Sequence, residues 1–285
     1  MTSTDRPARR ATTTRQRSWS LALASSALAV FVWFGSQRNS AGPDAGTTFS
    51  GKATVGEVQS GATFRVGTFN IHSGRGRDGR TDLARVAELL RPADFVGLNE
   101  VRGAAPFNND DQAEVIGGAL ECAWLFAPAE QRWWNQFYGN AVVSDLAVKN
   151  WQRIPLPRKA AKSFRNIVLV TADLGNERIR ILCTHLERSS TADRIAQLQA
   201  VTSLFLALQP PVILLGDLNT VRADEHLQPL LAGDGVVDAL AKQPKDDPRR
   251  IDWILLRGLE AVAAGQDDSG ASDHPYYWAD LRLVR

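Results

Sequence analysis

The residues from 64 to 285 alternate between short apolar runs and longer segments with helical periodicity. Many of the apolar runs are hydrophobic on both faces, which is typical of β-strands buried between two layers. Strands are predicted at 64–71, 93–101, 141–144, 166–174, 179–186, 211–218, 251–258 and 275–284. Helices are predicted at 82–90, between Thr81 as a candidate cap and Pro92 as a stop, and at 191–209. This alternation predicts an α/β fold with the sheets in the middle and the helices outside.

Polar residues capable of catalysis or metal binding stand where these strands end or begin. In the run VILLGDLN (212–219), Asp217 and Asn219 are two residues apart, so on an extended strand they would lie on one face. Any one such residue alone could belong to a turn, but buried carboxylates are costly unless they are paired or bound to metal. Together these residues predict a functional site: Asn70, Glu100, His185, Asp217, Asn219, Asp252, Asp273 and His274.

Six motifs that contain these residues resemble the endonuclease/exonuclease/phosphatase superfamily. In chain order they are TFNIHSG (68–74), GLNEV (97–101), THLE (184–187), GDLNT (216–220), IDWILL (251–256) and SDHPYYWADL (272–281). The superfamily includes secreted deoxyribonucleases, abasic-site endonucleases, inositol-polyphosphate phosphatases and neutral sphingomyelinases. The resemblance implies a four-layer αββα sandwich, in which two packed mixed β-sheets are flanked by helices.

The resemblance also implies how the acidic and amide residues act. Asn70 and Glu100 resemble the family's metal ligands, and Asp273 resembles a residue that adds a metal contact. Oxygen ligands of this kind suit Mg²⁺ or Mn²⁺ better than Zn²⁺. Asp217 resembles the group that orients and activates the attacking water, and Asn219 resembles the group that holds the phosphate.

The histidines and one arginine match further family positions. His274 resembles the histidine that works with a carboxylate, here Asp252, as general base or phosphate contact. His185 matches a histidine of the deoxyribonuclease-like and sphingomyelinase-like members, where abasic-site endonucleases usually carry an amide. Arg165, just before a predicted strand, resembles a phosphate-binding arginine of deoxyribonucleases.

These residues predict a metal-dependent hydrolase that cleaves a phosphate ester by in-line attack of water. His185 and Arg165 favour a nuclease-like phosphodiesterase, whose substrate would be a nucleic acid. A phosphatase, a sphingomyelinase-like hydrolase of phospholipid head groups and a non-catalytic binding module on the same fold are the alternatives. Residues 1–38 hold six arginines and one acid, which leaves 27 basic and 30 acidic residues and a net charge of −3 for the rest. The domain therefore lacks the broad basic surface of a dedicated nucleic-acid-binding protein.

The N-terminal segment predicts export. Residues 1–17 are polar and basic, and within residues 18–35 the stretch from Trp19 to Gly35 carries no charge. Five arginines precede this stretch and only Arg38 follows closely, so the basic end is predicted to stay in the cytoplasm and the domain to lie outside. An uncleaved signal anchor in the membrane is favoured over a cleaved signal peptide, which would leave the domain secreted or periplasmic.

The composition of residues 36–62, rich in Gly, Ser, Thr and Ala, predicts a flexible linker and leaves residues 63–285 as the catalytic domain. In that domain Cys122 and Cys183 could pair in an oxidising compartment, but their apolar surroundings favour two buried free thiols.

Two further stretches could set the substrate. A Gly-rich loop carries Arg75, Arg77 and Arg80, which suit extra phosphates, although an ordinary solvated loop is commoner. An aromatic group suits stacking on bases, contact with lipid or ordinary core packing; it consists of Trp133, Trp134, Phe137 and Tyr138.

Overall fold

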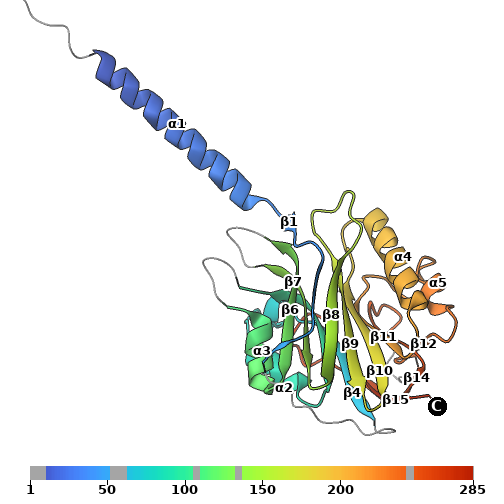
Figure 1. Ribbon diagram of the computed structural model, residues 1–285. Helices are drawn as coiled ribbons and strands as arrows, with labels where there is room; N and C mark the ends of the chain where they lie inside the picture. Colours follow the sequence, from blue (N-terminus) through green and yellow to red (C-terminus); the bar gives the residue numbers. More distant parts are fainter. Residues whose placement is uncertain (1–10, 52–62, 105–109, 132–136, 242–246, 285) are drawn as a thin grey trace, which may run out of the picture.

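The computed structural model describes residues 11–51, 63–104, 110–131, 137–241 and 247–284 (Figure 1). The chain forms two mixed β-sheets packed face to face, with helices on the outer face of each. Three predictions fall partly outside the described residues. They concern the basic N-terminus at 1–10, the end of the linker at 52–62, and the aromatic residues Trp133 and Trp134.

The first sheet has eight strands. Their spatial order is β1 (Asn39–Ser40), β6 (Ala123–Gln131), β7 (Tyr138–Ser144), β5 (Phe95–Arg102), β4 (Phe64–Asn70), β15 (Tyr276–Leu283) and β14 (Leu259–Asp267), with β3 (Ser50–Gly51) also paired to β6. β4 and β5 run parallel, and the other pairs are antiparallel.

The second sheet has seven strands. Their order is β12 (Val237–Asp238), β13 (Asp252–Arg257), β11 (Val212–Asp217), β10 (Glu177–His185), β9 (Asn166–Leu174), β8 (Ala147–Pro155) and β2 (Asp44–Gly46). Only β10 and β11 are parallel among the described pairs of this sheet.

Three apolar cores correspond to the three interfaces between the four layers. Between the sheets, Phe95 and Val66 of the first pack with Ile213 and other residues of the second. The first sheet is covered by α2 (Leu83–Leu90) and α3 (Gln112–Leu120), the second by α4 (Thr191–Ala207) and α5 (Gln228–Leu231). Strands with apolar residues on both faces fit this arrangement because each sheet is buried on both sides. The predicted αββα sandwich is confirmed.

Each predicted strand and helix is present, with one correction at a cap. The side chain of Asp82, and not that of Thr81, accepts a hydrogen bond from the backbone N–H of Arg85 at the start of α2. Asp82 takes this role because it directly precedes the first helical residue, where a carboxylate can reach the free N–H groups of the first turn. Cys122 and Cys183 are both buried free thiols, as predicted, and they lie in different cores.

Residues 37–51, here called the N-terminal strap, bind to both sheets. β1 and β3 pair with β6 at the edge of the first sheet, and β2 pairs with β8 at the edge of the second. The guanidinium of Arg153 on β8 also donates to the carbonyl oxygens of Gly42 and Ala41, at 2.9 and 3.0 Å. The prediction of a flexible linker is therefore wrong for these residues, because the open edges of β6 and β8 offer backbone partners that local composition does not reveal.

The helix α1 (Ala11–Ser36) precedes the strap and extends away from the sandwich in Figure 1. Over the part of the chain that the structure describes, none of the helices is both long and apolar enough to span a membrane.

Candidate active site

Three neighbouring strands of the second sheet place His185, Asp217 and Asp252 side by side. His185 is opposite Asp217 in the parallel pair β10 and β11, and Asp217 is opposite Asp252 in the antiparallel pair β11 and β13. All three residues are buried, with exposures of 3%, 1% and 2%. The pairing of these strands therefore places three ionisable groups in a row at one end of this sheet.

Glycine is required beside this row. Gly216 has φ of 141°, and a Cβ at this position would lie 1.9 Å from the carbonyl oxygen of Thr184 on β10. Only a residue without a side chain lets β11 approach β10 this closely just before Asp217.

The strand ends at Asp217, so Asn219 does not continue along its face. Asn219 has φ of 48°, and its backbone N–H donates to Asp217 Oδ1 at 2.8 Å, closing a turn through the aspartate side chain. Its side-chain amide donates to the carbonyl oxygen of Leu186 at 3.0 Å. The expectation that the Asp217 and Asn219 side chains share a strand face is wrong, because the chain turns after Asp217 instead of continuing as a strand. The second N–H of the Asn219 amide is left for another acceptor.

Glu100 reaches the site through a bulge in β5. The pairing of β5 with β7 is irregular between Leu98 and Val101, and Glu100 has φ of 61°. A bulge of this kind redirects a side chain, and strained backbone is concentrated at functional sites. Asn99, the residue before Glu100 in the bulge, is buried, whereas the Glu100 side chain lines a cleft.

His185 is held as a neutral imidazole. Its Nδ1 lies 2.9 Å from Nη1 of Arg165, which can only donate, so Nδ1 accepts and the ring proton is on Nε2. Nε2 faces Asp217 Oδ2 at 3.5 Å. Burial lowers the pKa of His185 well below its ordinary value, and the positive charges of Arg165, His274 and Arg188 lower it further.

His274, in contrast, is held as a protonated imidazole. Burial alone would lower the pKa of His274, but the hydrogen bond of its Nδ1 to Asp252 Oδ2 at 2.8 Å, with the nearby carboxylates, raises that pKa to about 9. Its Nε2 lies 3.9 Å from Asp217 Oδ2. The predicted pairing of His274 with Asp252 is thus present in the structure.

Asp217 lies between the two histidines. Burial, reinforced by the negative charge of Asp252, raises the pKa of Asp217, while His274 and hydrogen bonds from Asn219 and Asn70 oppose that rise. The side-chain amide of Asn70 donates to Asp217 Oδ2 at 3.1 Å. Such a carboxylate is poised to exchange a proton, which is the property expected of a catalytic base.

The predicted metal ligands come together from neighbouring segments of the first sheet. Asn70 ends β4 and is opposite Asn99 in the parallel pair with β5, one residue before Glu100. The carbonyl oxygen of Asn70 accepts from Ser272 Oγ at 2.7 Å, beside Asp273. Among the described residues no side chain donates to the Glu100 carboxylate. Carboxylate and amide oxygens are the ligand types that hard divalent cations take, so Glu100, Asn70 and Asp273 supply a suitable donor set.

A second group could also hold a cation. Ligand atoms of Asp217, Asp252 and His274 all lie within 4.8 Å of one another. Asp252 Oδ1 is buried and has no hydrogen-bond partner among the described residues. His274 would have to lose its proton to bind a metal, because a protonated imidazole has no free lone pair.

A buried amide network beneath the site was not predicted. The Asn99 amide donates to Asn140 Oδ1 at 2.9 Å and to the carbonyl oxygen of Thr184 at 3.1 Å, and Asn99 Oδ1 accepts from the backbone N–H of Asp217 at 3.0 Å. Asn140 in turn donates to Asn166 Oδ1 at 2.8 Å. The network connects the two sheets and fixes the position of Asp217. Its only sequence signal is a set of asparagines inside apolar strands.

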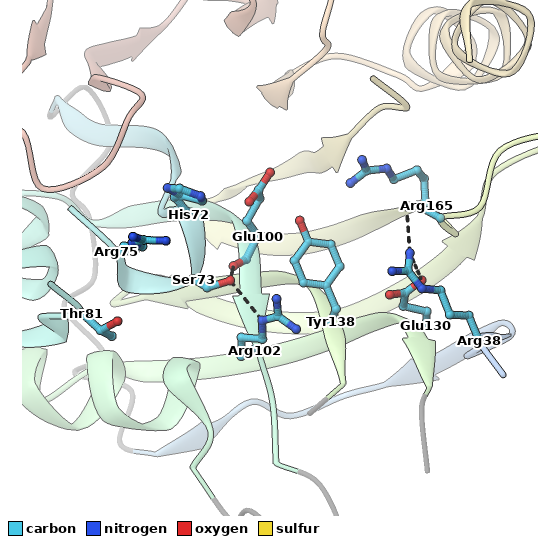
Figure 2. Close-up of a pocket in the computed structure, with 11 residues that line it drawn as sticks. Arg38, His72, Ser73, Arg75, Thr81, Glu100, Arg102, Glu130, Tyr138 and Arg165 are labelled. Carbon is cyan, nitrogen blue, oxygen red and sulfur yellow. Dashed lines mark hydrogen bonds and ion pairs between the residues drawn. The ribbon is translucent and has the colours of Figure 1, made fainter. Parts of the chain in front are cut away.

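A cleft of about 450 Å³ opens beside Glu100 (Figure 2). It is lined by Arg38, His72, Ser73, Arg75, Thr81, Glu100, Arg102, Glu130, Tyr138, Ser163 and Arg165. Figure 2 shows the Glu100, Tyr138 and Arg165 side chains pointing to the same side of the sheet. Arg165, the predicted phosphate ligand, thus connects the cleft to His185. Tyr138 belongs to the aromatic group that was predicted to suit either substrate stacking or core packing, whereas Arg102 and Arg38 were not predicted as site residues.

Comparison with known proteins agrees with this geometry. The profile of the Endonuclease/Exonuclease/phosphatase family matches residues 67–274. No match is found among curated proteins.

Solved structures with the same fold include enzymes and proteins of unassigned role. An endonuclease/exonuclease/phosphatase from Beutenbergia cavernae DSM 12333 is similar, with 25% identity, a TM-score of 0.66, and coverage of 78% of this chain and 72% of that one. A family protein from Leptotrichia buccalis C-1013-b has 16% identity, a TM-score of 0.63, and coverage of 77% and 100%. D. rerio TDP2 complexed with single strand DNA product has 19% identity, a TM-score of 0.59, and coverage of 78% and 99%.

Proposed function

Because the chain belongs to the endonuclease/exonuclease/phosphatase family, we propose that it is a divalent-metal-dependent phosphodiesterase. The observation that carries the proposal is the buried carboxylate of Asp217, with one neutral and one protonated histidine on either side of it. Hydrolysis of a phosphate ester needs a base for water and positive charge for the phosphoryl oxygens, and this arrangement provides both.

Asp217 accepts the proton of the attacking water in this proposal. Its Oδ1 accepts from the N–H of Asn219 and its Oδ2 accepts from the Asn70 amide, and Oδ2 is the oxygen that faces both histidines. As water attacks phosphorus, its proton moves to Asp217 Oδ2, the ester P–O bond breaks, and the leaving oxygen departs as an alkoxide that takes up a proton from solvent. The raised pKa of Asp217 makes its carboxylate a stronger base than an exposed aspartate.

His274 acts as a phosphate contact. A histidine whose pKa is raised to about 9 carries its proton near neutrality, so it cannot also be the general base. Its positive charge stabilises the phosphoryl oxygens, and Asp252 fixes the ring orientation. His185 is neutral, and its Nε2–H can donate a hydrogen bond to the same group.

The metal belongs with Glu100 in this proposal. Glu100, Asn70 and Asp273 would hold Mg²⁺ or Mn²⁺, which would supply charge for the phosphoryl and leaving oxygens. We prefer this set to Asp217, Asp252 and His274 because the latter group already contains its own cation, the protonated imidazole.

A nucleic acid is the substrate class we propose to test first. The neighbour D. rerio TDP2 is complexed with single strand DNA product, and the cleft beside Glu100 is lined by four arginines and two glutamates. The test compares single-stranded DNA, duplex DNA, RNA, inositol phosphates, sphingomyelin and bis(p-nitrophenyl) phosphate, each with Mg²⁺ and with chelator. Mg²⁺-dependent cleavage of a diester that is lost in Asp217→Asn is the expected result. Binding without turnover of any of these compounds would instead support a non-catalytic module.

We also propose that the domain is exported. The support is the uncharged stretch 19–35 after five arginines, and the exposed apolar side chains of α1, including Trp33 and Phe34 at 59% and 62%. A C-terminal tag, cell fractionation and external protease test the location. A tag that external protease reaches, or a tag released as soluble protein, supports export. A tag protected inside intact cells overturns it. The length of the product then separates a retained segment from a cleaved one.

A further inference from the structure

The N-terminal strap brings an arginine to the active-site cleft. Arg38 lies just before β1, and its Nη1 is 3.5 Å from Ser163 Oγ and 3.9 Å from Glu130. Its backbone is held in place because Asn39 and Ser40 pair with β6. In Figure 2, Arg38 lies on the same side of the cleft as Arg165. The family match begins at residue 67, so the strap lies outside the matched region.

The cleft holds cationic groups that no acid fully neutralises. Among the described residues, neither Arg75 nor Arg102 forms an ion pair. Arg102 donates to Ser73 Oγ at 3.1 Å and lies 5.2 Å from the Tyr138 ring centre. The side chain of Arg38 is 41% exposed. These guanidinium groups therefore keep donors for an anion that enters the cleft.

The hollow on the opposite side of the site has a different charge pattern. It has a volume of about 430 Å³ and includes Asp252 and His274 in its lining. Its three arginines are each paired with an aspartate: Arg77 with Asp268, Arg249 with Asp247, and Arg250 with Asp238. Within the part of the chain that the structure describes, the two hollows that flank the catalytic row thus differ, because unpaired arginines line only the one beside Glu100.

We propose that Arg38, at the end of the cleft nearest Arg165, forms a second anion-binding subsite for a phosphate next to the one that is hydrolysed, with Arg75 and Arg102 adding positive charge along the cleft. This proposal rests on the proposed phosphodiesterase function and makes the substrate a polyanion whose further phosphate extends toward the N-terminal strap. A guanidinium binds phosphate oxygens through paired N–H donors, which gives orientation as well as affinity. The second phosphate could belong to a nucleic-acid strand or to a compact polyphosphate.

Binding is measured in the Asp217→Asn background with Mg²⁺ present, so that cleavage does not interfere. The probes are fluorescein-labelled decathymidylate, followed by anisotropy, and tripolyphosphate, followed by competition at fixed free Mg²⁺. We expect Arg38→Gln to raise the dissociation constant of at least one probe by about tenfold, the loss of one charge-assisted hydrogen bond. Arg38→Lys should restore part of the binding, because the positive charge is retained.

Arg282→Gln is the matched control. Arg282 is exposed, pairs with Glu260 and lies at the far end of β15 from His274, and its replacement removes the same charge. An effect of Arg38→Gln on decathymidylate alone assigns the phosphate to a strand, and an effect on tripolyphosphate alone assigns it to a compact polyphosphate. Dissociation constants in Arg38→Gln equal to those of Arg282→Gln for both probes would overturn the subsite. Hydrolysis of bis(p-nitrophenyl) phosphate by the unaltered protein tests the proposed function separately.

Discussion

His185 and His274 approach the same carboxylate oxygen of Asp217 from different sheets, at 3.5 and 3.9 Å. His185 ends a strand of the second sheet, and His274 precedes a strand of the first. Arg165 holds the first as a neutral acceptor, and Asp252 holds the second as a cation. Two residues of one type thereby have different roles at one carboxylate.

Replacing either histidine should impair turnover. We expect His185→Ala and His274→Ala each to lower kcat by about 10² or more, the range for groups that assist proton transfer or stabilise charge. Steady-state kinetics on bis(p-nitrophenyl) phosphate measure the effect. His226→Ala is the control, because His226 is part-exposed and lies near Glu225, outside the site. Unchanged kcat in His185→Ala would remove that residue from the mechanism.

Activity should fall at alkaline pH as His274 loses its proton. The pKa of His274 is raised to about 9, so its positive charge is present below that pH and is lost as the pH rises through it. Asp252→Asn removes the main cause that raises this pKa, and burial then favours the neutral ring. The alkaline limb of the kcat/KM profile should therefore move to lower pH. An NMR titration of the His274 ring checks the assignment, and a limb that stays in place argues against it.

Metal dependence should be lost on neutralising Glu100. Glu100→Gln is expected to abolish Mg²⁺-dependent hydrolysis and to weaken Mn²⁺ binding measured by calorimetry, while the unfolding midpoint stays close to that of the unaltered protein. The comparison variant is Asp252→Asn, which alters the other candidate cluster. Loss of Mn²⁺ binding in Asp252→Asn with binding retained in Glu100→Gln would place the metal at that cluster instead.

The amide network should support both stability and catalysis. Asn99→Leu leaves the backbone N–H of Asp217 and the oxygens of Asn140 and Thr184 without their partner. We expect a loss of about 2 to 4 kcal/mol in the free energy of unfolding, because buried unsatisfied groups are costly. We also expect a lower kcat. Urea unfolding measures the first effect, with the exposed Asn150→Leu as control.

Asp193 should contribute to acid stability. Its carboxylate accepts from the backbone N–H groups of Lys159, Ala160 and Ala161 and from Ser190 Oγ. These bonds lower the pKa of Asp193 from 3.8 to about 2. The stabilisation is therefore complete above the unfolded value of 3.8 and is lost as the pH falls through about 2.

Asp193→Asn should accordingly lower the urea midpoint at neutral pH and flatten its decline in acid. Glu88→Gln, at an exposed carboxylate, should leave the pH dependence nearly unchanged. If the urea midpoint of Asp193→Asn fell as steeply in acid as that of the unaltered protein, other groups would be responsible for the acid destabilisation.

The sequence predicted the central strands because their apolar runs are buried on both faces. It did not predict β6, β8, β14 or α3, since Pro128 interrupts β6, two glycines interrupt α3, and β8 and β14 are largely exposed on one face. The site residues could be predicted because polar groups at the ends of buried strands are conspicuous. The pairing of His274 with Asp252 was also predicted, but the neutral state of His185 was not, because it depends on burial and on the contact with Arg165.

Other site features depend on contacts that no local pattern encodes. Asn99, Asn140 and Asn166 become a network only when the two sheets pack together. Glu100 points into the cleft because of a bulge, and Asn219 leaves the strand face because of a turn. Arg38 enters the cleft only because the strap pairs with β6.

The strap determines how much of the chain must be kept for the protein to avoid self-association. β6 and β8 would become free edges if residues 37–51 were removed. Free edges expose rows of unpaired N–H and C=O groups that recruit strands from other molecules. A protein shortened to begin at residue 63 should thus self-associate through both sheets, and one that begins at residue 37, which keeps the strap, should stay monodisperse.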